Sequence, residues 1–136
     1  LLIMSQITIM WIVSTLQILI ALGLINVWIF RSGRATKYRG AGAQNMKQEF
    51  IVYGLPVWAM YVVGFLKMMI VVVMVSVLFA PYLMVPFGIT AFALLVVLMI
   101  GAIAMHIKVK DTLMKIFPAI CMLFMSALAL YLTLSI

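Results

Sequence analysis

Four ionisable side chains of this sequence lie near or within apolar segments and could do chemistry at a membrane. Lys67 is the clearest, because it lies 11 residues after Pro56 in an apolar run, about 16 Å along a helix. A lysine near mid-membrane costs at least about 2.5–3.5 kcal/mol to insert, so a functional role is the default expectation. Three roles stay open: a ligand or proton site, an ion pair with Glu49 or Asp111, or a side chain running over Gly64 to the cytoplasmic headgroups.

The other three ionisable residues are Glu49, His106 and Asp111, all expected on the cytoplasmic side. We expect them to converge with Lys67 on a polar pocket that faces the cytoplasm, and we favour a pair between Lys67 and Asp111. The Asp111 carboxylate can fix the tautomer of His106. Simpler roles are an interfacial His106 in water and Asp111 as the N-cap of the last helix. Gln17, near mid-membrane, either bonds across helices or contacts a quinone or substrate.

The inventory of ligating residues excludes several cofactor classes. With one cysteine, Cys121, and one histidine, the chain cannot form an internal disulfide or supply two histidines to a haem. No carboxylate or histidine cluster has metal-ligand spacing, and there is no Ser-His-Asp set or phosphate-binding loop. We expect no metal and no cofactor held by this chain alone; in electron transfer the cofactor would be quinone or belong to a partner.

The elements that must position these residues are membrane-spanning helices. The chain is 69% hydrophobic and 8% charged, whereas about a quarter of a soluble domain is charged. From Met68 to Ile107 there is no Lys, Arg, Asp or Glu. As a helix this run would measure about 60 Å, twice the hydrocarbon thickness, and Pro81 lies where it would turn. We predict an all-α integral membrane four-helix bundle, one domain over residues 1–136, with spans at about 7–30, 56–79, 86–106 and 112–133.

A basic linker, residues 31–49, separates the first two spans. Its cations flank apolar segments, which favours lipid contact over nucleic-acid binding. The segment 45–53 is predicted to form a short cytoplasmic amphipathic helix before the second span. Trp11 and Trp28 are spaced for the two membrane interfaces. The expected headgroup contacts are Arg31, Arg34, Lys37 and Arg39.

The distribution of positive charge predicts the topology. Outside the spans, basic residues occur in the first linker and around the last loop, and none lies at the Pro81 turn or the ends. The positive-inside rule therefore places both basic loops in the cytoplasm and both termini on the opposite side of the membrane. The first apolar run is too long for a signal peptide and lacks a basic start, so we expect a retained span, with Met4 as the natural first residue.

Several of these residues together resemble the DoxX-like family of small four-span membrane proteins. The resemblance covers roughly residues 53–130. It rests on Gly54-Leu55-Pro56 before the second span, Gly64-x-x-Lys67 within it, His106 closing the third, and Asp111 and Pro118 in the fourth.

This sequence departs from the family pattern at Ile70 and Lys110, where many members have glycine. Members are found widely in bacteria, so the resemblance implies a bacterial inner membrane protein with both termini in the periplasm. The family name comes from a subunit of a thiosulfate:quinone oxidoreductase, and a eukaryotic branch resembles assembly chaperones. The resemblance implies a non-catalytic accessory or structural subunit of a larger membrane complex, one linked to quinone, with no enzyme activity on its own. Alternatives are an oxidoreductase subunit that binds quinone or a small anion at Lys67, and a small transporter using Lys67 and His106.

The charge distribution makes a direct prediction about sidedness. Cysteines introduced at Gly42 and at Leu83 should react with an impermeant thiol reagent from opposite sides of the membrane, with Leu83 periplasmic. Labelling of both positions from the same side would contradict the four-span arrangement.

Overall fold

Most of the described residues are helical, and four of the described helices are long and apolar enough to cross a membrane. The computed structural model describes residues 2–135. Within them α1 is continued by a π-helical turn, η1, and two short turns, η3 and η4, join α3 to α4. The predicted all-α, four-span membrane bundle is confirmed. The helices are α1 (Leu2–Ile25), η1 (Asn26–Phe30), η2 (Gly40–Gly42), α2 (Met46–Val52), α3 (Val57–Phe79), η3 (Pro81–Leu83), η4 (Met84–Gly88), α4 (Ile89–Lys108) and α5 (Leu113–Leu134).

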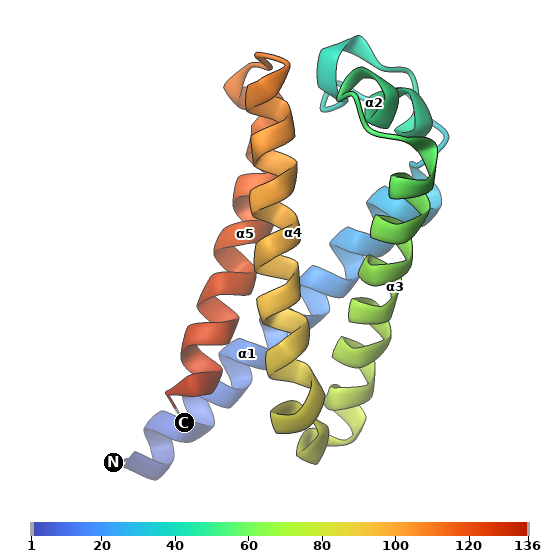
Figure 1. Cartoon of the computed structure of the whole chain (residues 1–136). Helices are drawn as coiled ribbons and strands as arrows, with labels where there is room; N and C mark the ends of the chain where they lie inside the picture. The colour runs from blue at the N-terminus through green and yellow to red at the C-terminus, as the bar shows by residue number, and fades with distance from the viewer. Residues whose placement is uncertain (1, 136) are drawn as a thin grey trace.

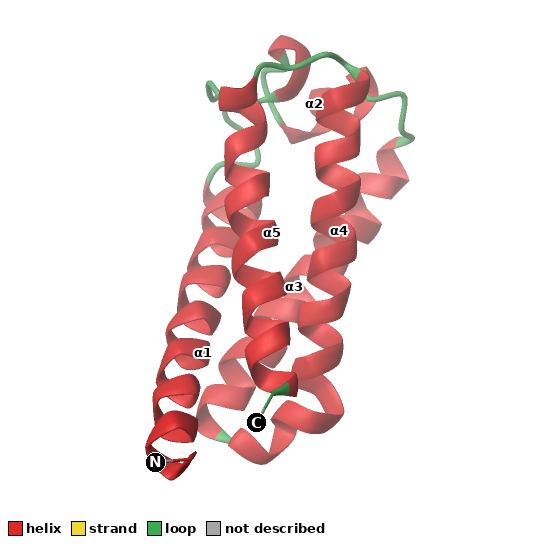
Figure 2. Ribbon diagram, turned by 90° about the vertical axis from the view of Figure 1, so that its left-hand side faces the viewer, coloured by secondary structure: helices red, strands yellow, loops and turns green. Residues whose placement is uncertain are grey.

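The four long helices form an uneven bundle. Helix α1 packs against α3 and α5, and α4 packs mainly against α5. Helices α3 and α4 meet at their shared turn and diverge toward the other end, where α2 and the linker lie (Figure 1). Both termini lie at the end with the α3–α4 turn, opposite α2 (Figures 1 and 2).

The apolar core occupies the half of the bundle next to the α3–α4 turn. It includes Ile20 of α1, Met74 of α3, Phe92 of α4 and Ala129 of α5, each of them fully buried. Gln17 is also buried there, and its Nε2 donates to the Met74 carbonyl oxygen at 3.2 Å. The core thus joins the helices at one end and leaves the end near α2 less tightly filled.

The turn between α2 and α3 explains why Gly54, Leu55 and Pro56 follow one another. Gly54 has a φ of +81°, a left-handed conformation that glycine adopts without steric cost. Its N–H donates to the Ile51 carbonyl and the next N–H donates to the Phe50 carbonyl, which together close α2. Pro56 then precedes the first residue of α3, where its missing N–H costs nothing.

The same closing turn ends α4, but with lysine in the glycine position. Lys110 has a φ of +58°, its N–H donates to Ile107, and the N–H of Asp111 donates to His106. Many family members have glycine at this position. Lys110 therefore adopts a strained backbone conformation that glycine would adopt without strain. Helix α5 begins after Thr112, so the expected role of Asp111 as its N-cap is wrong.

Removing the strain at Lys110 should stabilise the protein. Lys110→Gly should raise the free energy of unfolding by about 1 kcal/mol, because glycine has no Cβ to clash at positive φ. Lys110→Ala is the matched control, since it removes the same charge but keeps the Cβ. Thermal unfolding in detergent measures both, and a glycine variant no more stable than the alanine variant would contradict the strain.

Candidate functional site

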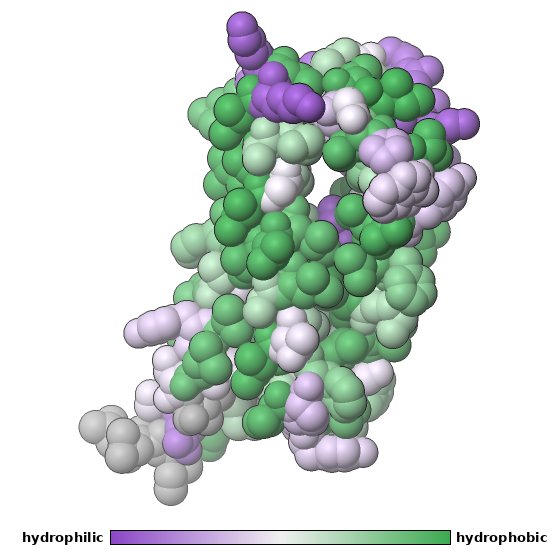
Figure 3. Space-filling model, in the orientation of Figure 1, coloured by the Kyte–Doolittle hydropathy of each residue, from purple (hydrophilic) through white to green (hydrophobic). Residues whose placement is uncertain are grey.

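A cavity of about 690 Å³ fills the space where α3 and α4 diverge. Its walls come from the end of α1, from α2 and from the three remaining long helices, and they are mostly apolar. On α4, Gly101 and Ala102 line it, and their small size leaves room. Figure 3 shows this hollow on one face, with hydrophilic atoms inside it and hydrophobic surface around it. The polar groups that line it gather near α2.

Lys67 lies on the wall of this cavity and is 7% exposed. Its Nζ lies 4.8 Å from the centre of the Trp28 ring, within the range of a cation–π interaction. Among the described residues, no carboxylate oxygen lies within 4 Å of that nitrogen. The expected direct pairing of Lys67 with Asp111 or Glu49 is therefore wrong.

Gly64 makes this arrangement possible. A Cβ at Gly64 would lie 2.9 Å from the Trp28 ring, so any larger residue would displace the indole. The space over Gly64 that was expected to guide the lysine to the headgroups is thus occupied by Trp28. Gly64 precedes Lys67 by about one helical turn, so the Trp28 ring can pack on Gly64 and lie next to the Lys67 ammonium. Trp28 was predicted as an interfacial anchor, and the structure turns it inward against α3.

His106 and Asp111 form the second polar centre. The His106 Nδ1 lies 2.7 Å from Asp111 Oδ2, a contact that orients the imidazole. His106 is 6% exposed, so it is buried rather than interfacial. The other Asp111 oxygen accepts the backbone N–H of Ala41 at 3.0 Å and lies 3.8 Å from the Lys115 Nζ. This carboxylate joins the linker to the α4–α5 turn.

Tyr53 connects that centre to Glu49. Its hydroxyl donates to Glu49 Oε1 at 2.8 Å and lies 3.5 Å from both ring nitrogens of His106. Burial, reinforced by the Glu49 carboxylate, raises the pKa of Tyr53 above its ordinary value, so the hydroxyl stays protonated and donates. Lys108 adds a further link, because its Nζ donates to the Tyr53 carbonyl oxygen at 2.8 Å.

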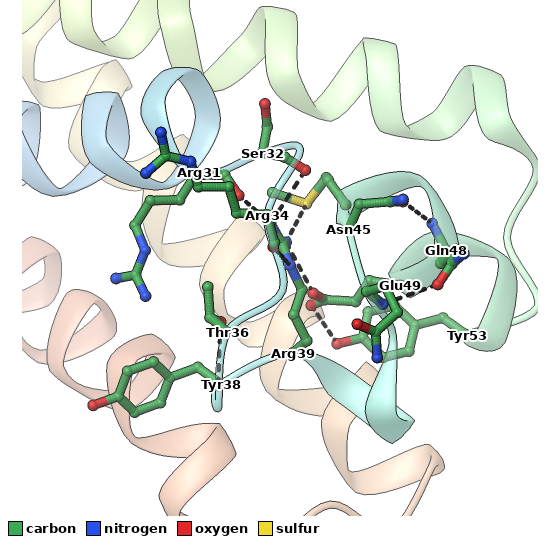
Figure 4. Close-up of polar contacts among 12 residues, drawn as sticks. Arg31, Ser32, Arg34, Thr36, Tyr38, Arg39, Asn45, Gln48, Glu49 and Tyr53 are labelled. Atoms are coloured by element: carbon green, nitrogen blue, oxygen red, sulfur yellow. Dashed lines mark hydrogen bonds and ion pairs between the residues drawn. The ribbon is translucent and has the colours of Figure 1, made fainter.

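Arg39 holds the linker together beneath α2. It is 5% exposed, its Nη1 donates to Glu49 Oε2 at 3.1 Å, and its other nitrogens donate to the carbonyls of Arg31, Ser32 and Arg34 (Figure 4). The prediction that Arg39 contacts lipid headgroups is therefore wrong. The side chains of Arg34 and Lys37 are exposed and Arg31 is partly so, which leaves these three available for headgroup contact.

Of the residues predicted to bind a ligand or form an ion pair, the structure brings three to one cavity and places a fourth next to it. The three that line the cavity are Lys67, Glu49 and His106. Asp111 does not line it but contacts the His106 ring. Gln17 is not among the cavity residues; it bonds α1 to α3. Sequence reasoning missed Trp28, Tyr53 and Arg39 as parts of the site. A signal existed for Tyr53, because a tyrosine ending an amphipathic helix can turn its hydroxyl toward buried polar groups.

Comparison with known families identifies the chain. A family model described as DoxX-like matches residues 15–128. The protein belongs to the DoxX-like family. Lys67, His106 and Asp111 all fall inside the matched segment of this DoxX-like protein. Neither curated proteins nor solved structures gave a significant match.

The buried role of Arg39 predicts a large effect of its removal. Arg39→Gln should lower the free energy of unfolding by about 3 kcal/mol, because it removes the cation paired with the largely buried Glu49 carboxylate and leaves several carbonyl oxygens without their donor. Arg34→Gln is the matched control and should change it by less than about 0.5 kcal/mol, since that side chain is exposed. Thermal unfolding in detergent gives both values, and similar losses would show that Arg39 is not the buried link.

The contact between Lys67 and Trp28 predicts energetic coupling between them. In a double-mutant cycle, Lys67→Met and Trp28→Leu should couple by about 1 kcal/mol, as a partly desolvated cation–π pair does. Lys67→Met and Asp111→Asn should be additive, because these side chains make no direct contact. Coupling to Asp111 but not to Trp28 would reverse this assignment.

Proposed function

We propose that this DoxX-like protein is a membrane subunit that binds a quinone headgroup in the cavity between α3 and α4, and that it serves a larger membrane redox complex. One observation carries the proposal. The buried Lys67 ammonium lies on the wall of an open, mostly apolar cavity, and no described carboxylate lies within 4 Å of it.

The cavity favours a ligand that reaches it from the bilayer. It lies between helices that are long and apolar enough to span a membrane, and its volume is in the range of small-molecule sites. Its apolar walls suit a hydrophobic ring and tail, whereas an ammonium donates hydrogen bonds to a carbonyl oxygen. A quinone combines these two features, which is the chemical reason to prefer it over a purely apolar lipid.

In this proposal, this chain binds the quinone and a partner subunit supplies the electrons that reduce it. Among residues 2–135, no group of three His, Cys, Asp or Glu residues is placed to hold a metal ion. Quinone reduction needs an electron donor, so the proposal places the donor on a partner subunit. We also propose the bacterial inner membrane as the location, as the family resemblance implies. The charge distribution supports a cytoplasmic position for α2 and both basic loops.

Quinone retention tests the proposal. The protein is purified in mild detergent with its co-purifying partners, and the quinone extracted per chain is measured. Wild type and Lys37→Met, a control that removes an exposed lysine, should retain similar amounts. Lys67→Met should retain about tenfold less, because a hydrogen bond from a charged donor is worth about 1.5 kcal/mol or more.

Two outcomes would contradict the proposal. One is equal quinone retention in Lys67→Met and wild type. The other is folded wild-type protein with its partners but without quinone, while a small anion binds in a Lys67-dependent way; the cavity would then be an anion site.

A further inference from the structure

A second hollow lies on the outside of the bundle, on the other side of Trp28 from the cavity described above. It is a groove of about 460 Å³ between the linker, α2 and the outer face of α3. Trp28 and Met46 line both hollows and so lie between them. Tyr61 and Phe65, which line the groove, are each about two-thirds exposed, so the groove opens where lipid surrounds the helices.

The groove changes from polar to apolar along its length. Ser32, Asn45 and Lys47 form one end, and Tyr61, Phe65 and Met68 of α3 line the other. Residues 61 to 68 cover about 10 Å of helix, directed from the α2 end toward the middle of the span. A cationic end followed by an apolar wall of this length matches an anionic headgroup with an acyl chain.

Among the described residues, no carboxylate pairs with the Lys47 ammonium. The protein has two acidic residues in all, and both are engaged elsewhere: Glu49 with Arg39 and Tyr53, Asp111 with His106. Lys47 is exposed and makes no ion pair with any described residue.

Ser32 adds polarity at the same end. Its carbonyl accepts from Arg39 and from the backbone N–H of Met46, whereas its hydroxyl points away from the Arg39 cluster (Figure 4). This end of the groove therefore offers a lysine ammonium and a hydroxyl to a phosphate group.

We infer that the groove is a binding site for one anionic phospholipid, with its phosphate at Lys47 and an acyl chain along Tyr61, Phe65 and Met68. The site is distinct from general attraction to the basic linker, because it uses a defined lysine and a defined apolar wall. It is also independent of the quinone proposal, since it lies outside the cavity.

Native mass spectrometry of the detergent-solubilised full chain tests the inference. Phosphatidylglycerol and phosphatidylcholine with the same acyl chains are titrated against wild type, Lys47→Gln, Lys37→Gln and Gly33→Phe. Lys37 is the matched control, an exposed linker lysine that does not line the groove. Gly33 lines the groove and has free space around its Cβ position, so a phenylalanine obstructs the groove without changing charge.

Wild type and Lys37→Gln should bind one phosphatidylglycerol in preference to phosphatidylcholine. Lys47→Gln should weaken that binding about fivefold, as expected for one lysine near an anionic lipid. Gly33→Phe should weaken it as well. Equal losses in Lys47→Gln and Lys37→Gln would overturn the inference in favour of diffuse charge. Unchanged binding in Gly33→Phe, or no preference for the anionic lipid, would overturn it too.

Discussion

The burial of one ammonium inside a membrane-spanning helix shapes the half of the bundle that contains α2. Lys67 lies at a depth where an uncompensated charge is costly. The face of the Trp28 ring provides the compensation, and it can do so because Gly64 leaves the ring a place to lie. Trp28 of η1 turns inward and α4 diverges from α3, so an open cavity remains beside the ammonium.

The two carboxylates determine how the region around α2 is held over that cavity. Glu49 receives Arg39 and Tyr53, so it joins the linker to α2. Asp111 receives His106 and the backbone of Ala41, so it joins the linker to the α4–α5 turn. Each carboxylate accepts hydrogen bonds from at least two groups. Two acidic residues can therefore provide acceptors for several cations and backbone N–H groups in this region. Because both carboxylates are engaged there, Lys67 has no acidic partner within 4 Å among the described residues.

Much of the fold was predictable because hydropathy and turn residues act locally. The uncharged run after Met68 predicted two spans, and Gly54 and Pro56 predicted the start of α3. The depth of Lys67 in its span followed from the same counting. The direction in which a side chain points around a helix axis did not, because four strongly apolar helices carry little amphipathic signal. Trp28 was therefore predicted to face the interface.

The pairing of charges was less predictable than their position. Lys67 was expected to pair with Asp111, but His106, five residues before that acid, reaches it across the α4–α5 turn. Arg39 was grouped with its exposed neighbours by composition, although the linker folds around it. Composition gives the number of charges, whereas the path of the backbone decides which carbonyls and carboxylates each one meets.

The central claim is that a quinone-like ligand binds beside Lys67 against Trp28. The fluorescence of Trp28 reports on this site most directly once Trp11 and Trp58, the other two tryptophans, are replaced by phenylalanine. Titration with a short-chain quinone should quench that emission to a saturating limit, and the saturable component should disappear in Lys67→Met. Quenching that rises linearly with quinone and is the same with and without the lysine would contradict the claim.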